Sequence, residues 1–269
     1  MPTPAETILS KAVLPTWLDT AGIRAKWPAE IRRRAFFSAR TASAAYLDRL
    51  RSLCAEVAAG EIDNATARKA LIGFLDAAGY APGPDDTGLR NLASRRRLDL
   101  ILDTQRQMAH GAALAVSQGS GPALSAFPAW RLERYGSRRA PRRDWLARWK
   151  AAGDACGWEG ALRDRFVALK GSPIWRGLGD GAGGFRDTLG NPYPPFAFGS
   201  GMDWTPVRRE ECRDLGLDPD GGRKPEAPSL SPGQEDVRKA AAGLSPEMRE
   251  ALVAQLRATV ANSGTRTAK

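Results

Sequence analysis

Arginines alternate with aromatic rings in one stretch near the middle of the chain, RLERYGSRRAPRRDWLARWK, residues 131–150. Guanidinium and ammonium groups bind phosphate oxygens, and Tyr135, Trp145 and Trp149 carry rings of the kind on which nucleic-acid bases stack. The stretch therefore predicts a polyanion-binding site made of eight basic side chains: Arg131, Arg134, Arg138, Arg139, Arg142, Arg143, Arg148 and Lys150. The alternative, which composition alone slightly favours, is a solvated arginine surface whose aliphatic stems lie over a tryptophan core.

The overall composition makes this stretch stand out. The 269 residues carry a formal net charge of +10, and residues 131–150 supply +6 of it, because only Glu133 and Asp144 oppose the eight cations. The basic character is therefore concentrated in one patch. A content of 42% hydrophobic and 26% charged residues is typical of a soluble domain and excludes disorder throughout.

The sequence predicts neither a membrane span nor a secretory signal. No run approaches the roughly 20 apolar residues of a spanning helix. The start, MPTPAETILSKAVLPTW, lacks the basic-then-apolar order of a signal peptide. We expect an intracellular protein with no membrane partner.

Histidine and cysteine, the residues most often used as base and nucleophile, are scarce. His110 is the only histidine, and its predicted helix places it on the polar side with Asp103 and Arg106, so we expect an exposed or interface side chain. The cysteines are odd in number and form no C-x-x-C pair, which argues against a disulfide framework and a zinc site. We expect buried free thiols at all three positions: Cys54, Cys156 and Cys212.

Two apparent ligand motifs lack the surroundings they need. Residues 179–184 match G-x-G-x-x-G, but no strand is predicted before them and no helix after them. Asp218 and Asp220 begin like a calcium loop, yet Ser229 stands where a bidentate glutamate belongs. Four further acids have no diagnostic metal-ligand spacing: Asp154, Asp164, Asp180 and Asp187. We expect no catalytic, cofactor-binding or metal-ligating residue, no cofactor, and no enzymatic activity.

The elements that position these residues begin with an N-terminal arm, 1–29, followed by a helical domain, 30–118. Apolar residues recur every three or four positions and predict three amphipathic helices, at residues 30–58, 64–79 and 87–117. Gly60 ends the first helix and Asn64 is the expected N-cap of the second. The three segments predict an antiparallel helical unit.

A second domain is predicted at residues 123–218, where six of the eight tryptophans fall: Trp130, Trp145, Trp149, Trp158, Trp175 and Trp204. Large rings favour a compact core. The predicted helices are short, at 142–152, ended by Gly153, and at 206–215 with Thr205 as N-cap. Strand candidates are weak, chiefly RFVALKG at 165–171 and PFAFGSG at 195–201. The fold class is therefore mainly α with a small α+β second domain.

Residues 191–204, NPYPPFAFGSGMDW, combine prolines, glycines and aromatic residues in a way that suits neither a helix nor a regular strand. Proline fixes φ and removes backbone donors, while Gly199 and Gly201 permit positive φ. The segment predicts an ordered, non-repetitive loop that its aromatic side chains hold in place.

The end of the chain changes composition again. Residues 219–243 have no apolar period and predict a flexible linker. Residues 244–262 predict an amphipathic helix, with Ser245 as N-cap and Pro246 in the first turn. Its apolar stripe could bind this chain's own domain or a partner, and the sequence leaves both open: Met248, Leu252, Leu256 and Val260.

Four segments, taken together and in order, resemble the C-terminal part of phage minor head proteins of the Mu F-like head-morphogenesis family. They are FPAWRLERYGSRRAPRRDWLARW, LKGSPIWRGLGD, NPYPPFAFGSGM and VRREECRDLGL. The preceding helix, LDLILDTQRQMAHGAA, occupies the place where that family carries a helix with an asparagine or glutamine and a run of small residues. The resemblance extends over residues 30–217.

The resemblance implies a low-copy structural protein of a tailed-phage or prophage head, located in the virion head or head–neck region and in the host cytoplasm during assembly. The implied partners are the portal protein, the major capsid protein and, further, double-stranded DNA. The chain lacks the histidine that many members carry near 142–145 and their cysteines near 194–202, so no metal or redox feature is carried over. The alternative is a basic nucleic-acid-binding protein or metal-dependent nuclease that is not part of a head.

Overall fold

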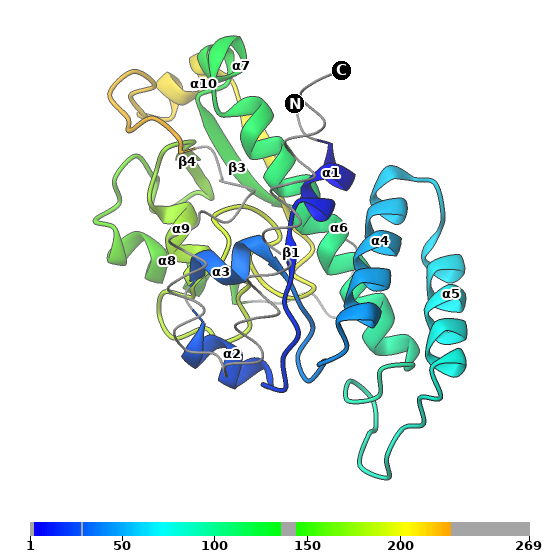
Figure 1. Cartoon of the computed structure of the whole chain (residues 1–269). Coiled ribbons are helices and arrows are strands. Elements are labelled where there is room, and N and C mark those ends of the chain that lie inside the picture. Colours follow the sequence, from blue (N-terminus) through cyan, green and yellow to red (C-terminus); the bar gives the residue numbers. More distant parts are fainter. Residues whose placement is uncertain (1–2, 28, 136–143, 227–269) are drawn as a thin grey trace. The chain divides into compact units, whose positions relative to one another are not determined.

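The structure, a computed structural model, describes residues 3–27, 29–135 and 144–226. The chain divides between Arg106 and Gln107 into an N-terminal unit and a C-terminal unit. This division falls inside the long helix α6 (Arg95–Gln118), whereas the sequence places the boundary just after that helix. Helices dominate and the sheets are small (Figure 1), which confirms the predicted fold class.

The N-terminal unit contains α4 (Ala44–Ala59) and α5 (Asn64–Ala77), which run antiparallel beside the first part of α6 (Figure 1). Local caps explain their limits. Ser43 accepts a hydrogen bond from the amide of Tyr46, and Gly60 ends α4 at a φ of 76°. Asp63, and not Asn64, caps α5. The side-chain amide of Asn64 is therefore free to donate a hydrogen bond to Asp103 on α6.

The prediction of one helix over residues 30–58 is wrong in its first half. This region forms α3 (Ala29–Arg34) and the short strand β2 (Ala35–Phe36), and α4 begins only at Ala44. β2 pairs in parallel with β1 (Ala12–Val13), a partner far away in the sequence that a local periodicity cannot reveal. Arg40 then adopts a φ of 57°, which no right-handed helix contains.

Residues 4–27, which the sequence assigns to an N-terminal arm, supply part of the core of the N-terminal unit. They form α1 (Pro4–Leu9), β1 and α2 (Thr20–Lys26). Ile8, Leu14, Ile23 and Trp27 are buried, and Trp27 packs edge-on against Phe37 at 5.1 Å between ring centroids. Burial of these side chains anchors the segment to the unit.

The third predicted helix begins later than expected. Residues 87–94 form turns, and α6 starts at Arg95, close to where the amides of Arg97 and Leu98 bond back to Ser94. The predicted apolar stripe is largely confirmed, because five of its members are buried: Leu98, Leu102, Met108, Ala109 and Ala112.

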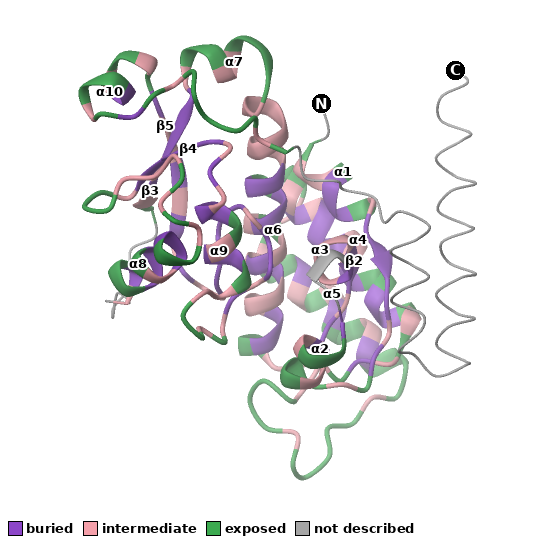
Figure 2. Cartoon of the chain, turned by 90° about the vertical axis from the view of Figure 1, so that its left-hand side faces the viewer, coloured by how far each residue is buried: buried purple, intermediate pink, exposed green. Residues whose placement is uncertain are grey.

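The C-terminal unit is built on an antiparallel sheet in the order β4 (Val167–Leu169), β3 (Ala129–Arg134), β5 (Met202–Val207). Figure 2 colours much of this sheet as buried. Helices α7 (Gly121–Ala126), α8 (Trp145–Ala155), α9 (Ile174–Asp180) and α10 (Arg209–Asp214) complete the unit. β4 confirms the strand predicted in RFVALKG.

Three other predictions for this unit need correction. PFAFGSG is not a strand, and pairing along β3 begins only at Met202. Pro206 pairs with Trp130 inside β5, so the last predicted helix starts at Arg209, and the Thr205 hydroxyl donates to Glu133 instead of capping it. α8 continues through Gly153, where a side chain would overlap the ring of Trp158.

Large rings form the centre of the C-terminal unit, as predicted. Trp130 stacks on Trp204 with centroids 4.8 Å apart, and Trp175 meets Trp204 edge-on at 5.2 Å. Trp149 lies 5.6 Å from Trp175. The core therefore consists of rings supplied by β3, α8, α9 and β5, and these elements are fixed to one another by the same contacts.

Residues 191–201 form a loop that is part of this core, which confirms the prediction that its aromatic side chains hold it in place. Met202–Trp204, which the sequence assigned to the same loop, belong instead to β5. Phe196 is fully buried, has a φ of 56° and lies 6.1 Å from Trp175 at 18° between ring planes. The side-chain amide of Asn191 donates a hydrogen bond to the Tyr193 carbonyl, and the Ser200 hydroxyl donates one to the Pro195 carbonyl. The peptide bond between Pro194 and Pro195 is cis.

Part of the predicted linker packs against the C-terminal unit. Arg209 bonds Asp220 at 2.7 Å, Arg176 bonds Glu226 at 3.0 Å, and the backbone at Arg223 lies so close to Gly171 that a side chain there would overlap it. Residues 219–226 are therefore not a free tether. Residues 227–243, and the helix predicted at 244–262 with Met248, Leu252, Leu256 and Val260, lie outside the described residues.

Within the described ranges, no helix combines the length and the apolar character that crossing a membrane would take.

Candidate functional site

The basic stretch is divided between three parts of the C-terminal unit. Residues 131–134 belong to β3, residues 145–150 belong to α8, and residues 136–143 between them are not described. Four of the predicted polyanion-binding residues therefore lie outside the described part of the chain: Arg138, Arg139, Arg142 and Arg143. The other four, Arg131, Arg134, Arg148 and Lys150, have four different environments.

Arg131 lies on the polar face of the sheet. Strand alternation puts Trp130 and Leu132 on the core side, and Arg131 and Glu133 on the other, opposite Thr205 and Asp203. The Arg131 guanidinium forms an ion pair with Glu211 and lies 4.0 Å from Glu133. Its charge is thus largely balanced by neighbouring carboxylates.

Arg134 and Tyr135 are exposed where β3 ends. One guanidinium nitrogen of Arg134 donates to the Ser200 carbonyl at 3.2 Å, and the Tyr135 amide donates to the Gly201 carbonyl at 2.9 Å. The Tyr135 ring is 70% exposed. The loop 191–201 holds the backbone here, while both side chains reach solvent.

Arg148 is buried, with 6% of its side chain exposed. Its guanidinium lies 2.7 Å from a carboxylate oxygen of Asp144 and 2.7 Å from one of Asp187. The same group lies over the rings of Phe185 at 4.2 Å and Trp145 at 5.3 Å. Two carboxylates and two rings occupy this cation, so Arg148 has a structural role and leaves the polyanion-binding set.

Lys150, two residues further along α8, is exposed. Trp145 and Trp149 on the same helix are buried, at 4% and 0% exposure, and the Trp149 ring nitrogen donates to the Leu162 carbonyl. These two rings are therefore not available to stack on bases, which supports the alternative interpretation for this part of the stretch. Among the described basic and aromatic residues of the stretch, Arg134, Tyr135 and Lys150 are exposed.

Two of the four acids considered as metal ligands, Asp154 and Asp187, have partners in the protein. Asp154 accepts a hydrogen bond from the Trp158 ring nitrogen at 2.9 Å, and Asp187 pairs with Arg148. His110 is 59% exposed, as predicted, and lies 3.9 Å from Asp203. Among the residues that the structure describes, no three histidine, cysteine, aspartate or glutamate side chains form a group that could hold a metal ion.

The cysteines are free thiols. Cys54 and Cys212 are buried, as expected, while Cys156 is only partly buried. Burial raises the pKa of Cys54 to about 12, so its thiol stays protonated at neutral pH. A structural role fits such an inert thiol.

Lys170 is a buried cation that the sequence did not single out. Its ammonium lies 4.1 Å from the centre of the Trp130 ring and donates to the Gln118 carbonyl at the end of α6. Burial lowers the pKa of Lys170 to about 8. The Lys170 ammonium thus bonds a carbonyl at the C-terminus of α6, where a positive charge is favourable. The sequence around Lys170 predicts a strand and contains no signal of this contact.

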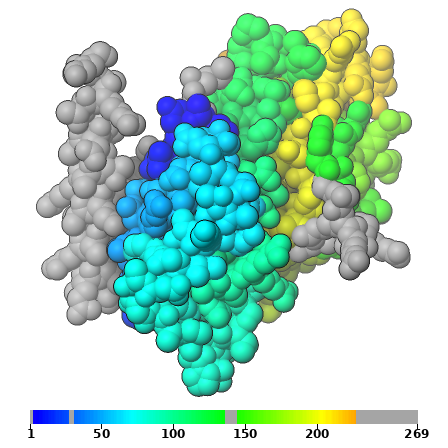
Figure 3. Space-filling model, turned by 90° about the vertical axis from the view of Figure 1, so that its right-hand side faces the viewer, coloured from blue at the N-terminus to red at the C-terminus, as the bar shows by residue number. Residues whose placement is uncertain are grey.

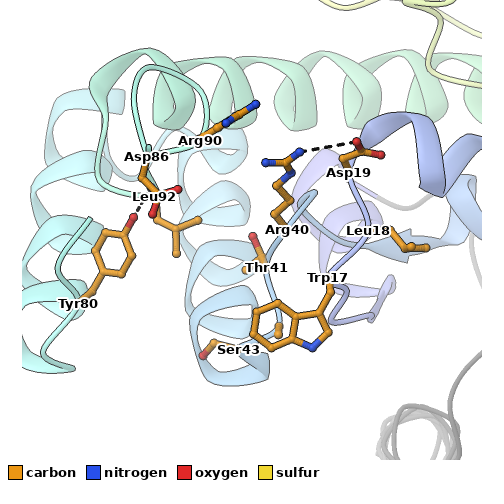
Figure 4. Close-up of a pocket in the computed structure, with 11 residues that line it drawn as sticks. Trp17, Leu18, Asp19, Arg40, Thr41, Ser43, Tyr80, Asp86, Arg90 and Leu92 are labelled. Carbon is orange, nitrogen blue, oxygen red and sulfur yellow. Dashed lines mark hydrogen bonds and ion pairs between the residues drawn. The ribbon is translucent and has the colours of Figure 1, made fainter. Parts of the chain in front are cut away.

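The N-terminal unit contains a pocket of about 780 Å³ that the sequence did not predict. Three separate segments form its walls, residues 17–19, 40–43 and 80–92 (Figure 4). The last of these includes the exposed loop 81–90, which projects from the end of the unit (Figure 3). Because the lining comes from three distant segments, no local motif could have revealed it.

A comparison of the chain with protein-family models found no matching family, and comparisons with curated proteins and with solved structures found no significant match.

Proposed function

We propose that this chain is a non-catalytic structural protein of a tailed-phage or prophage head, which assembles with portal and major capsid proteins. The proposal starts from the resemblance of four segments to Mu F-like minor head proteins. One observation carries it further. Rings from three of those segments pack one against the next: the ring centroids of Trp149 and Trp175 are 5.6 Å apart, and those of Trp175 and Phe196 are 6.1 Å apart.

This packing supports a scaffold role for the residues that carry the resemblance. Trp149 and Phe196 are fully buried and Trp175 is 2% exposed, so their contribution is to hold helices and loop together. The engagement of Asp154 by a tryptophan ring nitrogen and of Asp187 by Arg148 also favours a structural protein over a metal-dependent nuclease, because both carboxylates already have partners.

The basic stretch supplies the proposed contact with a polyanion, either the packaged genome or an acidic surface of the portal. Arg134 and Tyr135 precede residues 136–143 in the sequence, Lys150 follows them on α8, and all three are exposed. Arg148 is left out because it is buried with two carboxylates, and Arg131 contributes little because Glu211 balances it.

The assembly proposal is tested by co-expressing the full-length chain, and a chain ending at residue 243, with the portal and major capsid proteins of the same genome. We expect the full-length chain to co-purify with at least one of them. Association of neither form with either protein would refute the proposal. So would cleavage of linear DNA in magnesium or manganese that is lost when Asp154 and Asp187 are replaced by asparagine.

The polyanion contact is tested separately by measuring DNA affinity against salt concentration. Each phosphate contact contributes about −0.9 to the log–log slope on duplex DNA. Neutralising four arginines together should flatten the slope: Arg138, Arg139, Arg142 and Arg143. A control with the same loss of charge replaces four exposed arginines of the same unit, Arg163, Arg165, Arg186 and Arg213. Equal slopes for the two quadruple variants would show that net charge alone attracts DNA.

A further inference from the structure

Trp17 at the edge of the N-terminal pocket is unusually exposed for a tryptophan, at 77%. Its backbone is nevertheless fixed, because the amide of the buried neighbour Thr16 donates to the Thr41 carbonyl at 2.8 Å. Tyr80 lies on the opposite wall (Figure 4), and its hydroxyl oxygen accepts a hydrogen bond from the Leu92 amide at 3.0 Å. The pocket therefore has an aromatic ring on each side: Tyr80 is held through its hydroxyl, and Trp17 extends from a fixed backbone.

Arg40 stands on the pocket wall in a backbone conformation that suits glycine better. Its φ is 57°, and its amide is fixed by a 2.9 Å hydrogen bond to the Leu18 carbonyl. A side chain at positive φ is unfavourable, and such strain collects at functional sites. The guanidinium is about half exposed, at 47%, and lies 3.7 Å from Asp19. An arginine is thus kept where local backbone preference disfavours it.

The lining carboxylates have local partners. Asp19 accepts a hydrogen bond from the Gly22 amide at 2.8 Å as the N-cap of α2, besides its pairing with Arg40. Asp86 accepts one from the Gly83 amide at 3.1 Å. Arg90 is exposed at the edge of the pocket. The lining therefore carries two guanidinium groups and two carboxylates, and of these Arg40 and Asp19 already pair with each other.

Arg97 adds a buried positive charge behind the lining. It is 5% exposed, and among the described residues its hydrogen bonds go to neutral oxygens of Ser38, Ala39, Thr41, Leu89 and Arg90. Thr41, Leu89 and Arg90 belong to two of the segments that line the pocket, and Ser38 and Ala39 directly precede the segment 40–43. Arg97 therefore holds both walls in place and makes the site more favourable for an anion.

Flat aromatic faces next to guanidinium groups match a ligand with a planar ring and a phosphate. The volume of about 780 Å³ is within the range of small-molecule sites. We propose that this pocket binds a nucleoside phosphate, with the base against Trp17 and the phosphate near Arg40 and Arg90. The nucleotide is either free or an unpaired member of a single-stranded nucleic acid. This site goes beyond the proposed structural function and is separate from the basic stretch.

The test titrates the purified full-length chain with two probes, AMP and a twelve-nucleotide oligo(dA), by isothermal titration calorimetry. Adenosine and inorganic phosphate are the controls that lack one half of the ligand. Trp17→Ala removes an exposed ring. Arg40→Gly removes the guanidinium and suits the positive φ, so thermal stability should be kept or raised. Arg49→Ala is the matched control, because Arg49 on α4 is similarly exposed, at 43%, and lies outside the pocket lining.

We expect Trp17→Ala to weaken binding by about 5- to 150-fold, the usual contribution of one stacked base. Arg40→Gly should weaken it by about tenfold, and Arg49→Ala should leave it unchanged. Binding of AMP identifies a site for a free nucleotide, whereas binding of oligo(dA) alone identifies a nucleotide within a strand. The proposal is overturned if neither probe binds in a Trp17-dependent way, if inorganic phosphate binds as well as AMP, or if Arg40→Gly lowers stability and spares affinity.

Discussion

Arg148 and Lys150 lie two residues apart on α8, and replacing each with alanine should change the stability of the protein by very different amounts. Arg148→Ala leaves Asp144 and Asp187 without the cation that lies 2.7 Å from each of them. Breaking a buried ion pair from one side costs about 3–5 kcal/mol. Because 36% of the Asp144 side chain and 33% of the Asp187 side chain are exposed, water can replace part of the lost interaction, and we expect a loss of about 2–3 kcal/mol.

Lys150→Ala should change the free energy of unfolding by no more than about 0.5 kcal/mol, because Lys150 is exposed. For a unit spanning residues 107–228, 1 kcal/mol corresponds to about 4 °C in Tm, so Arg148→Ala should melt about 10 °C below wild type. Near-ultraviolet circular dichroism follows this transition, because the stacked tryptophans of the core lie in that unit. Melting points of the two variants within about 2 °C of each other would refute the buried ion pairs.

Two further predictions concern a close backbone approach and a buried amine. Gly179→Ala should destabilise the protein by at least about 2 kcal/mol, because a side chain there would overlap the Asn191 carbonyl. Gly73→Ala, on the open face of α5, should instead stabilise the protein by up to about 1 kcal/mol. Urea unfolding measures the free energy of unfolding of both variants, and equal effects would contradict the loop packing. Lys170 should make stability depend on pH, because its pKa is about 8 in the folded chain and 10.5 in the unfolded chain. Between these two values the unfolded chain binds a proton that the folded chain has released, so the stability of wild type relative to Lys170→Met should rise with pH. A difference that stays constant over this window would contradict a lowered pKa.

Much of the helical framework follows from the sequence because its signals are local. Gly60 ends α4 where the sequence placed the end, and the apolar stripes repeat within each helix. The two N-caps were not predicted: Ser43 begins α4 well after residue 30, and Asp63 caps α5 in place of Asn64. The loop 191–201 was also predicted, since proline fixes φ and glycine permits positive φ where they stand, whereas Met202–Trp204 join β5 by pairing along β3. The compact tryptophan core follows from composition, because large rings concentrated in one region favour burial together.

The parts that the sequence did not predict depend on contacts between distant segments. β2 forms because Ala35–Phe36 finds Ala12–Val13, and β5 takes in Pro206 because it pairs along β3. A periodic pattern describes one segment and contains no information about its partner. The predicted helices at 30–58 and 206–215 were too long for this reason.

For the candidate sites, the sequence determined which charges and rings the chain contains, and the tertiary structure decided what each of them does. Arg131, Arg148 and Lys150 are all basic residues of one stretch. In the fold, however, the first is balanced by a glutamate of α10, the second is buried between two aspartates, and the third is exposed. The pocket lined by Trp17 and Arg40 exists only after three distant segments have met. The environment of a side chain is set by neighbours that the backbone brings together from elsewhere, and for this reason its charge, exposure and use became known only with the fold.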